Sequence, residues 1–171
     1  MGAAPVVRGF LPADAAACAA IYAPFVAHTT VSLEIDPPDA AEIARRFAAL
    51  LDAGYPVLVA DAAGRIAGFA YAGAFRPRPG YRQTVEHSLY VDSDAQRAGI
   101  GAALLAAVVE ACRARGFRRM VGVISDPGRS HSLGFHLGRG FALAGTLHGV
   151  GHKFGRDLDV VLVERALDRE S

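Results

Sequence analysis

The stretch TVEHSLYVDSDAQRAGIGAALLAAVVEACRARG, residues 84–116, decides the fold. Its first part alternates polar and apolar side chains and is rich in β-branched and aromatic residues, which predicts a strand over 81–91. Its last part predicts a helix that closes at Gly116, because apolar residues recur along one helix face: Ile100, Ala103, Leu104, Ala107, Val108 and Ala111. Between strand and helix lies a short loop that contains Gly99 and Gly101. The stretch therefore predicts a strand that leads through a glycine loop into the N-terminus of a helix.

Each part of this unit allows two interpretations. Side chains two apart in a strand share a face, so Glu86 belongs to a polar row with Thr84, Ser88 and Tyr90. That row is either the water-exposed face of an ordinary strand or a functional face. The glycines either make a tight connection or let a phosphate approach the free N–H groups of the helix N-terminus. Two known phosphate motifs do not apply, because Leu104 replaces the third glycine of the dinucleotide fingerprint and no Gly-Lys-Ser/Thr follows.

The flanking sequence extends the pattern in both directions. On the N-terminal side we expect a strand at 5–9, helices at 12–28 and 39–54, and a hairpin of strands at 55–61 and 65–75. Asp39 is the expected N-cap and Gly54 the stop of the second helix, while Pro24 is expected to kink or end the first. On the C-terminal side we expect a strand at 118–125, a short helix at 130–140 and two closing strands within 141–167. The fold class is thus α+β (mixed α/β), with a largely antiparallel sheet of about seven strands and about four helices.

Length and composition limit the possible functions. The 171 residues form a single expected domain, 1–171, with its core at about 5–166. Eighteen basic residues against seventeen acidic ones leave no bulk charge that would favour nucleic acid or an anionic membrane. Cys18 and Cys112 lie in alanine-rich helical segments and are expected to be buried thiols. The six histidines lack ligand spacing, so no metal is expected.

The N-terminal sequence favours a cytoplasmic protein. It lacks the charged region and long apolar run of a secretory signal. No apolar run in the chain approaches the roughly 18 residues of a membrane-spanning helix. We therefore expect no membrane partner.

The run from Phe75 to Leu105 carries a resemblance to a known family. Gln96-x-x-Gly99-x-Gly101 after a polar-faced strand resembles the pyrophosphate loop of the GNAT superfamily of N-acetyltransferases. With the segments YPVLVAD, FRPRPGYRQTVEHSLYV, SHSLGFHLGRGF and GHKFGRDLDV, the chain is similar to the phosphinothricin and methionine sulfoximine N-acetyltransferase branch from about residue 6 to 164. The resemblance implies the GNAT fold, with acetyl-CoA bound where the fourth strand meets the third helix, and a homodimer.

The resemblance also implies where acetyl-CoA binds. The pantetheine arm is expected along the strand, with a backbone N–H there available to the developing oxyanion. The pyrophosphate is expected on the loop and helix N-terminus. The implied cofactor residues are Leu89, Tyr90, Val91, Gln96, Arg97, Ala98, Gly99, Ile100, Gly101 and Ala102, with Arg129 and Ser132 as further contacts.

Two residues match the family's catalytic positions. Glu86 matches the general base, which acts on the substrate ammonium directly or through water; partial burial that raises its pKa toward neutrality would suit that role. Its alternative is a surface glutamate. His136 matches a histidine in the helix where other acetyltransferases carry a tyrosine that protonates the thiolate; its alternative is a packing histidine. His87, on the opposite strand face from Glu86, is interpreted as structural.

The acceptor is expected to bind beside the strand. Arg76 and Arg78 flank Pro77 and are the candidates for a fork that holds an amino-acid carboxylate. A solvated basic loop is the alternative. The further substrate-binding candidates are Tyr81, Thr84, Val31 and Leu33, the last two because their loop resembles the one that shapes the acceptor pocket in this branch. The chain departs from the family's usual residues at Arg129, Leu137, Arg139, His152 and Asp157.

Three functions remain open from the sequence. The leading one is transfer of acetyl from acetyl-CoA, by direct attack in a ternary complex, to the α-amino group of a phosphinothricin-like or methionine sulfoximine/sulfone-like acceptor. The second is a protein or peptide N-acetyltransferase, which needs an open groove. The third is a CoA-binding module without turnover. The presence of Glu86 disfavours the CoA-binding module, and the altered 129–139 segment favours it.

Overall fold

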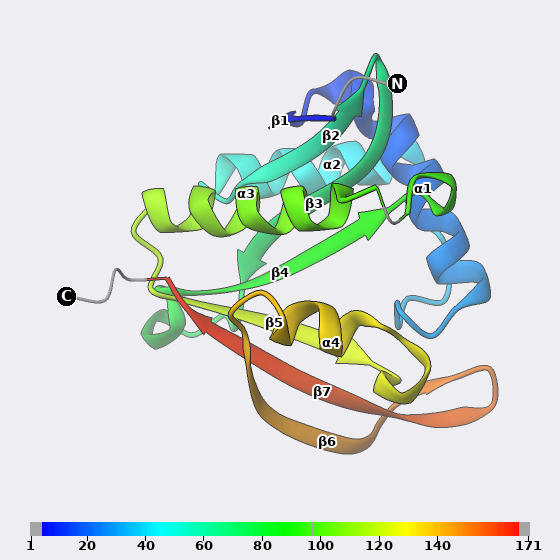
Figure 1. Cartoon of the computed structure of the whole chain (residues 1–171), viewed down its shortest axis with the longest axis vertical. Coiled ribbons are helices and arrows are strands. Elements are labelled where there is room, and N and C mark those ends of the chain that lie inside the picture. Colours follow the sequence, from blue (N-terminus) through cyan, green and yellow to red (C-terminus); the bar gives the residue numbers. More distant parts are fainter. Residues whose placement is uncertain (1–4, 97, 168–171) are drawn as a thin grey trace.

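The computed structural model of the chain describes residues 5–96 and 98–167 (Figure 1). Its helices are α1 (Ala15–His28), α2 (Ala40–Asp52), α3 (Ile100–Ala114) and α4 (Ser132–Leu137). Its strands are β1 (Val6–Gly9), β2 (Val57–Ala62), β3 (Arg65–Ala74), β4 (Thr84–Val91), β5 (Arg119–Ser125), β6 (Ala142–Lys153) and β7 (Arg156–Ala166). Four short 3₁₀ turns lie between these elements. The order of strands and helices confirms the one that the sequence predicts.

The strands form one sheet in the order β1-β2-β3-β4-β5-β7-β6. Every neighbouring pair is antiparallel except β4 and β5, which are parallel. The expected hairpin turn at Ala63 and Gly64 is confirmed, with φ values of 55° and 88° that suit a two-residue hairpin. The parallel pair requires a crossover, and α3 supplies it.

The parallel pair is where the sheet divides. Its register runs from Thr84 opposite Arg119 to His87 opposite Gly122 and ends there. Beyond that point, the remainders of β4 and β5 diverge, as Figure 1 shows. The divergence leaves one backbone edge of β4 without a strand opposite it.

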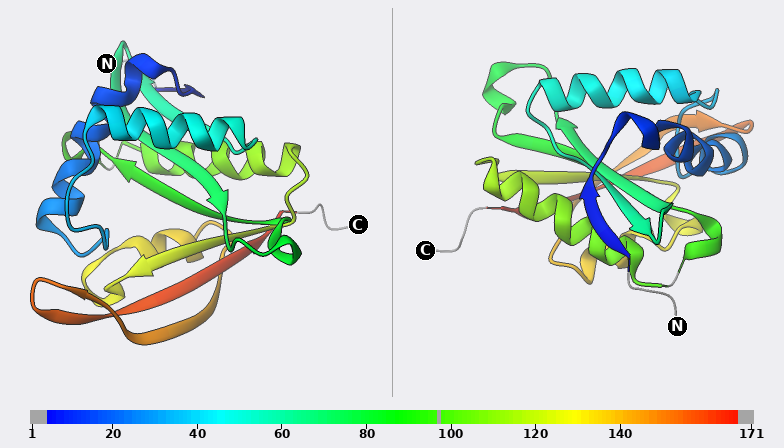
Figure 2. Two further views of the ribbon diagram at one scale, coloured as in Figure 1. Left: turned by 180° about the vertical axis from the view of Figure 1, so that it is seen from behind. Right: turned by 90° about the horizontal axis from the view of Figure 1, so that it is seen from above.

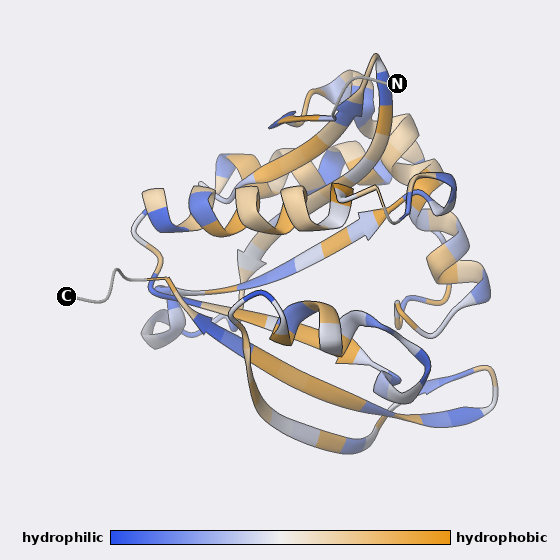
Figure 3. Cartoon of the chain, in the orientation of Figure 1, coloured by the Kyte–Doolittle hydropathy of each residue, from blue (hydrophilic) through white to orange (hydrophobic). Residues whose placement is uncertain are grey.

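Helices cover both faces of the sheet, and each face has its own core. α1 and α2 pack on one face around Phe47, Phe69 and Val59, and α3 packs on the other around Leu104 and Val85. Figure 2 shows the sheet between α3 and the α1–α2 pair when the molecule is viewed from above. Hydrophobic residues concentrate along α3 and along strands such as β2 and β7, whereas β4 is paler and partly hydrophilic (Figure 3). This three-layer arrangement is the physical reason for apolar residues on both sides of the central strands.

The buried face of α3 differs from the expected one. Ala103, which the helical spacing assigned to the apolar face, is exposed, whereas Leu105 and Val109 are buried. Burial of apolar area stabilises in proportion to that area, at roughly 25 cal/mol per Å². The larger Leu105 and Val109 side chains therefore turn toward the sheet in preference to alanine.

Of the two expected effects of Pro24, to kink or to end the first helix, the ending is wrong. After a 3₁₀ turn at Pro12–Asp14, α1 continues through Pro24 to His28. Proline removes one helical N–H, but the turns on either side bury Tyr22 and Val26 against the sheet. Tertiary packing of these residues outweighs the local preference.

Other boundaries shift by a few residues. β4 begins at Thr84 instead of residue 81, because Pro79–Tyr81 form a 3₁₀ turn that begins with proline. α4 is confined to Ser132–Leu137 and not 130–140, since Gly138 ends it and Gly140 has a φ of 80°. The expected cap is confirmed, because Asp39 Oδ1 accepts a hydrogen bond of 2.8 Å from the N–H of Glu42.

The expected burial of both cysteines is confirmed, and burial raises the pKa of Cys18 and of Cys112 to about 12. Among residues 5–96 and 98–167, none of the helices has the length and apolar character needed to cross a membrane. The same residues contain no group of three or more His, Cys, Asp or Glu side chains placed to hold a metal ion.

Candidate active site

A narrow cleft of about 80 Å³ opens where β4 and β5 diverge. Its walls come from both strands, from the loop after α1 and from α4. The lining residues are Val31, His87, Ser88, Leu89, Tyr90, Gly122, Val123, Ile124, Ser125, Ser130, Ser132 and His136. The predicted residues Leu89, Tyr90, Ser132, His136 and Val31 are thus brought together by the fold.

The backbone of β4 presents hydrogen-bonding groups to this cleft. The N–H of Asp92 donates to Ala67 of β3 (2.9 Å), and the carbonyl of Thr84 accepts from Phe75 (3.4 Å), so even-numbered residues of β4 turn their backbone groups toward β3. The odd-numbered residues of β4 turn their backbone N–H and C=O groups away from β3. Leu89 and Val91 therefore direct their N–H and C=O groups to the side where β5 has diverged. An extended amide-bearing chain can pair with this edge as a strand would.

The N-terminus of α3 lies at the end of β4. Gly99 is its N-cap with a φ of 78°, a conformation that favours glycine. The first N–H groups of the helix, which include those of Ile100, Gly101 and Ala102, have no partner within the helix and carry the positive end of its dipole. A Cβ on Gly101 would be 3.6 Å from the side chains of Phe135 and Val91, an ordinary contact, so internal packing does not demand glycine there. A side chain at this position would cover the amides at the start of α3, so glycine suits an anion site there, and the binding of pyrophosphate at this loop remains a prediction.

The other predicted cofactor residues are placed differently. Ala98 is exposed in the loop before α3, and Arg129 is exposed in the short turn before α4. Gln96 borders a separate groove of about 710 Å³ between α1 and the β4–α3 loop, and Arg97 lies outside the described residues. In that larger groove, Arg8 pairs with Asp14 and Arg65 with Asp92.

Glu86 lies on the opposite face of β4 from the core around Leu104. It is half-buried, and burial raises the pKa of its carboxyl group while the nearby Arg76 guanidinium partly opposes the rise. A shift in this direction is the one that would suit a general base. A raised carboxyl pKa suits a group that takes a proton from an ammonium near neutral pH. Its place in catalysis remains a prediction.

An aromatic cavity of about 350 Å³ lies on this same face, between α2 and strands β3 and β4. Tyr71 pairs across the strands with Ser88, two residues from Glu86, and Tyr90 packs on Tyr22 with ring centroids 4.6 Å apart. Burial raises the pKa of Tyr71 and of Tyr90, so both phenols stay protonated and remain able to donate a hydrogen bond. The lining residues are Tyr22, Ile43, Arg45, Arg46, Phe47, Ala49, Leu50, Phe69, Tyr71 and Tyr90.

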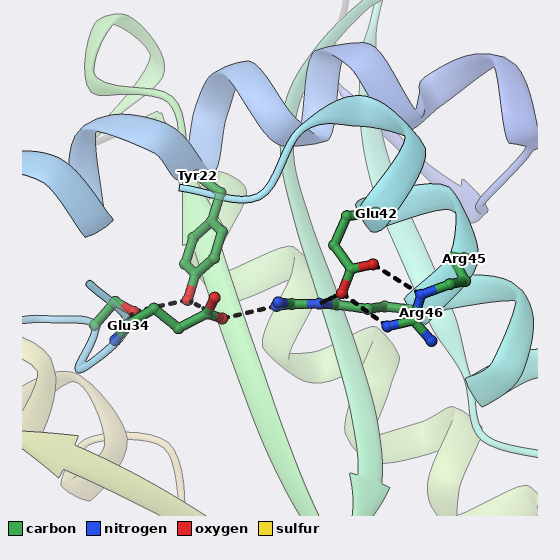
Figure 4. A network of polar contacts seen from close by, with 6 residues as sticks. Tyr22, Glu34, Glu42, Arg45 and Arg46 are labelled. Atoms are coloured by element: carbon green, nitrogen blue, oxygen red, sulfur yellow. Dashed lines mark hydrogen bonds and ion pairs between the residues drawn. The ribbon is translucent and has the colours of Figure 1, made fainter. Parts of the chain in front are cut away.

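A polar network crosses the mouth of this cavity from α1 to α2 (Figure 4). The Tyr22 hydroxyl donates to Glu34 (3.0 Å), and Arg46 binds the same carboxylate at 2.8 Å. Arg46 also binds Glu42 at 2.7 Å, and Arg45 binds Glu42 from its other side. The two carboxylates and two guanidinium groups balance in charge, so the network fixes the α1–α2 loop without adding net charge to the cavity.

The predicted arginine fork is only partly assembled. Arg76 is exposed, with its guanidinium carbon 4.5 Å from the ring centroid of Phe75, and it is the cation that acts on Glu86. Arg78 and Tyr81 are exposed in the turn before β4, where the Tyr81 ring packs edge-on against Phe75. Thr84 is half-buried at the start of β4.

The loop after α1 is pinned to the divergent end of the sheet. Ser125 Oγ donates to the carbonyl groups of Thr30 and, at 3.0 Å, Val31. The buried ammonium of Lys153 donates to Val26 and Ser32 carbonyls at 2.7 Å each, and burial lowers its pKa. Leu33 packs on Gly151, where a Cβ would be 3.1 Å from a Leu33 methyl. Val31 and Leu33 thus belong to a fixed wall.

His136 lies in the cleft wall on the α3 side of the sheet, whereas Glu86 points to the α2 side. Nδ1 of His136 is 2.7 Å from the carbonyl oxygen of Ser132, and Nε2 of His136 is 3.2 Å from Nε2 of His87. Both ring nitrogens therefore have partners within the protein. A role in proton transfer to the leaving thiolate remains a prediction.

Sequence reasoning missed three contributors to this site, Arg46, Glu34 and Lys153, and did not identify the partner of His87. Arg46 in α2 forms an ion pair with Glu34, twelve residues earlier in the α1–α2 loop. Lys153, near the other end of the chain, hydrogen-bonds to the same loop at Ser32. No local spacing signals such contacts. His87 gave a signal, since a histidine on the apolar face of a strand needs a buried partner.

Comparisons with known proteins find a family model and similar chains. Residues 22–141 match the model of the acetyltransferase (GNAT) family. The chain is 44% identical over 155 residues to a phosphinothricin N-acetyltransferase of Alcaligenes faecalis, which covers 91% of this chain and 79% of that protein. It is 43% identical over 157 residues to an L-methionine sulfoximine/L-methionine sulfone acetyltransferase of Pseudomonas paraeruginosa, with 91% of both chains covered. A crystal structure of a phosphinothricin acetyltransferase from Sinorhizobium meliloti in complex with acetyl-CoA superposes with a TM-score of 0.90 at 39% identity, covering 96% of this chain and 89% of that one.

Proposed function

The chain belongs to the GNAT family of acetyltransferases, and from that premise we propose that it acetylates the α-amino group of a small amino-acid-like acceptor. The donor is acetyl-CoA. The observation that carries the proposal is the end of the β4–β5 register at His87 and Gly122, which frees the β4 edge for the donor next to Glu86. Relatives that act on phosphinothricin and on methionine sulfoximine or sulfone indicate the class of acceptor.

The residues present fit acetyl-CoA. The backbone edge at Leu89 and Val91 matches the amides of a pantetheine arm, and the free amides at the start of α3 match a pyrophosphate. When bound, acetyl-CoA supplies an acyl group activated as a thioester, whose C–S bond breaks as the acceptor nitrogen bonds to the carbonyl carbon. One N–H group of this edge, at Leu89 or Val91, is available to the negative charge that develops on the carbonyl oxygen, while the other groups of the edge pair with the pantetheine arm.

Glu86 prepares the nucleophile. An amino acid carries its amine as an ammonium group at neutral pH, and only the neutral amine attacks a thioester. Glu86 takes the ammonium proton, directly or through one water, and its raised pKa brings its basicity closer to that task. After the C–N bond has formed, the nitrogen loses a second proton, which balances the proton taken up by the departing thiolate. Glu86 releases the first proton to solvent, so the net products are the N-acetyl amino acid, free CoA thiol and one proton.

The aromatic cavity receives the acceptor side chain. Its walls are largely apolar, with the phenols of Tyr71 and Tyr90 and the fixed Arg46 as polar groups. Sulfone, sulfoximine and phosphinyl oxygens accept hydrogen bonds from such donors. Arg76, close enough to act on Glu86, is the candidate for the acceptor carboxylate.

A thiol-release assay tests the proposal. Acetyl-CoA is combined with phosphinothricin, methionine sulfoximine, methionine sulfone, the proteinogenic amino acids and a few peptides, and acetyl-CoA binding is measured separately by calorimetry. Turnover confined to free amino acids and their analogues is the expected result. Turnover of peptides alone would support a protein N-acetyltransferase, and binding without any turnover would support a CoA-binding module.

We also propose a cytoplasmic homodimer. Its support is the exposed apolar side chains of β6, where Leu143, Leu147 and Val150 are 58%, 45% and 60% exposed. Side chains of this kind on one strand are typical of an interface between subunits. Light scattering of the purified chain tests the assembly, and a monomer at micromolar concentration would refute it.

A further inference from the structure

Two histidine rings are buried against each other where the cofactor cleft begins. His87 of β4 and His136 of α4 are 6% and 5% exposed, and their Nε2 atoms lie 3.2 Å apart. Phe141 packs against both rings, with centroid distances of 5.4 Å and 5.2 Å. A Cβ on Gly122 would be 3.1 Å from Nε2 of His87 and 2.9 Å from a Val163 methyl group. The absent side chain at Gly122 thus makes room for the pair.

The hydrogen bonds assign the proton positions on both rings. The Ser132 carbonyl oxygen, 2.7 Å from Nδ1 of His136, can only accept, so Nδ1 carries the proton. A neutral imidazole carries one N–H, which leaves Nε2 of His136 as an acceptor. The facing Nε2 of His87 must therefore be the donor. Its Nδ1 is then an acceptor, and this buried atom has no partner among the described residues.

Both rings are neutral in this arrangement. Burial lowers the pKa of His87 to about 3 and also lowers that of His136, to which Arg139 adds a smaller effect in the same direction. The hydrogen bond to the Ser132 carbonyl opposes the shift at His136. No carboxylate contacts either ring in the part of the chain that the structure describes. If both rings were protonated, no neighbouring carboxylate would offset the repulsion between the two positive charges.

The pair fastens α4 to the sheet. The ring of His136 binds the carbonyl one turn earlier in α4. The backbone carbonyl of His136 accepts hydrogen bonds from the N–H groups of Arg139 and of Phe141, the residue just before β6. The bond to His87 is the link from His136 to β4. α4 has only six residues, too few for a stable helix without such contacts. It also carries Ser132, which lines the cleft.

We propose that His87 is a positioning residue that holds His136 in the Nδ1–H form and thereby fixes α4 as a wall of the acetyl-CoA cleft. The pair supports donor binding by holding α4 in place, and His136 does not protonate the leaving thiolate, because its Nε2 bears a lone pair that accepts the hydrogen bond from His87. This inference rests on the proposed function in one respect, since it takes acetyl-CoA to be the donor that binds in the cleft.

Nitrogen NMR of the histidine side chains tests the proton positions in the whole chain with saturating acetyl-CoA. Between pH 6 and 8.5, one ring is expected as the Nδ1–H form and a second as the Nε2–H form, and neither titrates; the signal lost in His87→Gln identifies His87. A His136 ring with its proton on Nε2, or one that titrates in step with the alkaline limb of kcat, would overturn the proposal. The proton positions are read from the wild-type chain, and the variant serves only to assign the signal of His87.

Three variants test the function of the pair. His87→Leu, which has no donor, should raise the acetyl-CoA Kd and KM about 10-fold with kcat within about 3-fold, the scale of one lost buried hydrogen bond. His87→Gln, whose amide still donates, should change them less than about 3-fold, and the exposed His148→Gln serves as the matched control. A loss of kcat above about 100-fold at unchanged KM in His87→Leu would overturn the positioning role. The Kd is measured without an acceptor, so failure of this inference is distinguishable from failure of the proposed acceptor class.

Discussion

Glu86 and His87 are neighbours in β4 and lie on opposite faces of the sheet. Burial favours the neutral form of both, since it raises the pKa of Glu86 and lowers that of His87 to about 3. Glu86 is half-buried, with Arg76 as its nearby cation. His87 is sealed among His136, Phe141 and Gly122.

The difference shows how one strand serves two purposes. A group that exchanges protons needs a perturbed pKa and also access to its substrate, and only Glu86 has both. A titratable group without access is structural, however far its pKa is shifted. The alternation of side chains in β4 therefore separates acceptor chemistry on one face from the donor cleft and its support on the other.

The largest expected effect comes from Glu86→Gln, which should lower kcat about 10²- to 10⁴-fold, the usual scale for a positioned base. Acetyl-CoA binding should be retained. In the wild type, kcat/KM should fall as pH decreases through the raised pKa of Glu86, because the base becomes protonated. Turnover of the variant at the wild-type rate would remove Glu86 from the mechanism.

The same substitution tests the stability side of the comparison. A carboxyl group whose pKa is higher in the folded chain than in the unfolded one stabilises the fold at low pH, and this contribution is lost as pH rises. The uncharged Glu86→Gln should therefore be at least as thermally stable as the wild type at pH 7. A clear fall in Tm would show that the carboxylate holds the fold together.

Gly101→Val tests the donor face. A Cβ finds ordinary contacts there, so the fold should persist, but the branched side chain would cover the amides at the start of α3 and raise the acetyl-CoA Kd about 10- to 30-fold. The matched variant is Gly99→Ala, at a φ of 78°, which should lower stability by about 1 kcal/mol. Calorimetry and thermal unfolding together separate the two effects. Equal binding by wild type and Gly101→Val would place the pyrophosphate elsewhere.

Arg46→Met and Arg45→Met form a matched pair on the acceptor face. Arg46 joins α2 to Glu34 in the α1–α2 loop, whereas Arg45 contacts Glu42 within its own helix. Arg46→Met, which removes the ion pair to Glu34, should raise the acceptor KM about 5-fold, which corresponds to about 1 kcal/mol, and should leave kcat within about 2-fold. Arg45→Met should change the acceptor KM less than about 2-fold. Steady-state kinetics with a fixed acceptor would contradict the role of the network if the two variants behave alike.

The last prediction concerns acid stability. His87 has an ordinary pKa of 6.5 and a value of about 3 in the folded chain, so the unfolded chain binds a proton first as pH falls. The stability that neutral His87 contributes above pH 6.5 is lost as the pH falls from 6.5 to about 3. His87→Gln should therefore lose less stability than the wild type between pH 7 and 5, where each kcal/mol corresponds to about 2–4 °C in Tm. Parallel Tm curves for the two proteins would show that His87 is not neutral in the fold.

Much of the fold was predictable because its signals are local. The Asp39 cap, the turn at Ala63 and Gly64 and the strand–loop–helix unit of 84–116 each depend on residues a few positions apart. The misjudged places are those where tertiary packing opposes local preference. Pro24 remains helical because the residues around it are buried, and Leu105 replaces Ala103 on the inner face of α3.

The sequence by itself determined the order of the elements, the alternation that puts Glu86 and His87 on opposite faces, and the glycine loop before α3. These follow from the periods of strand and helix and from the backbone freedom of glycine. Only the tertiary structure decided that β4 and β5 part after His87, that His136 faces His87, and that Arg46 and Lys153 hold the α1–α2 loop. These contacts join residues distant in the chain, and the burial that shifts the pKa values of Glu86 and His87 exists only once the layers have packed.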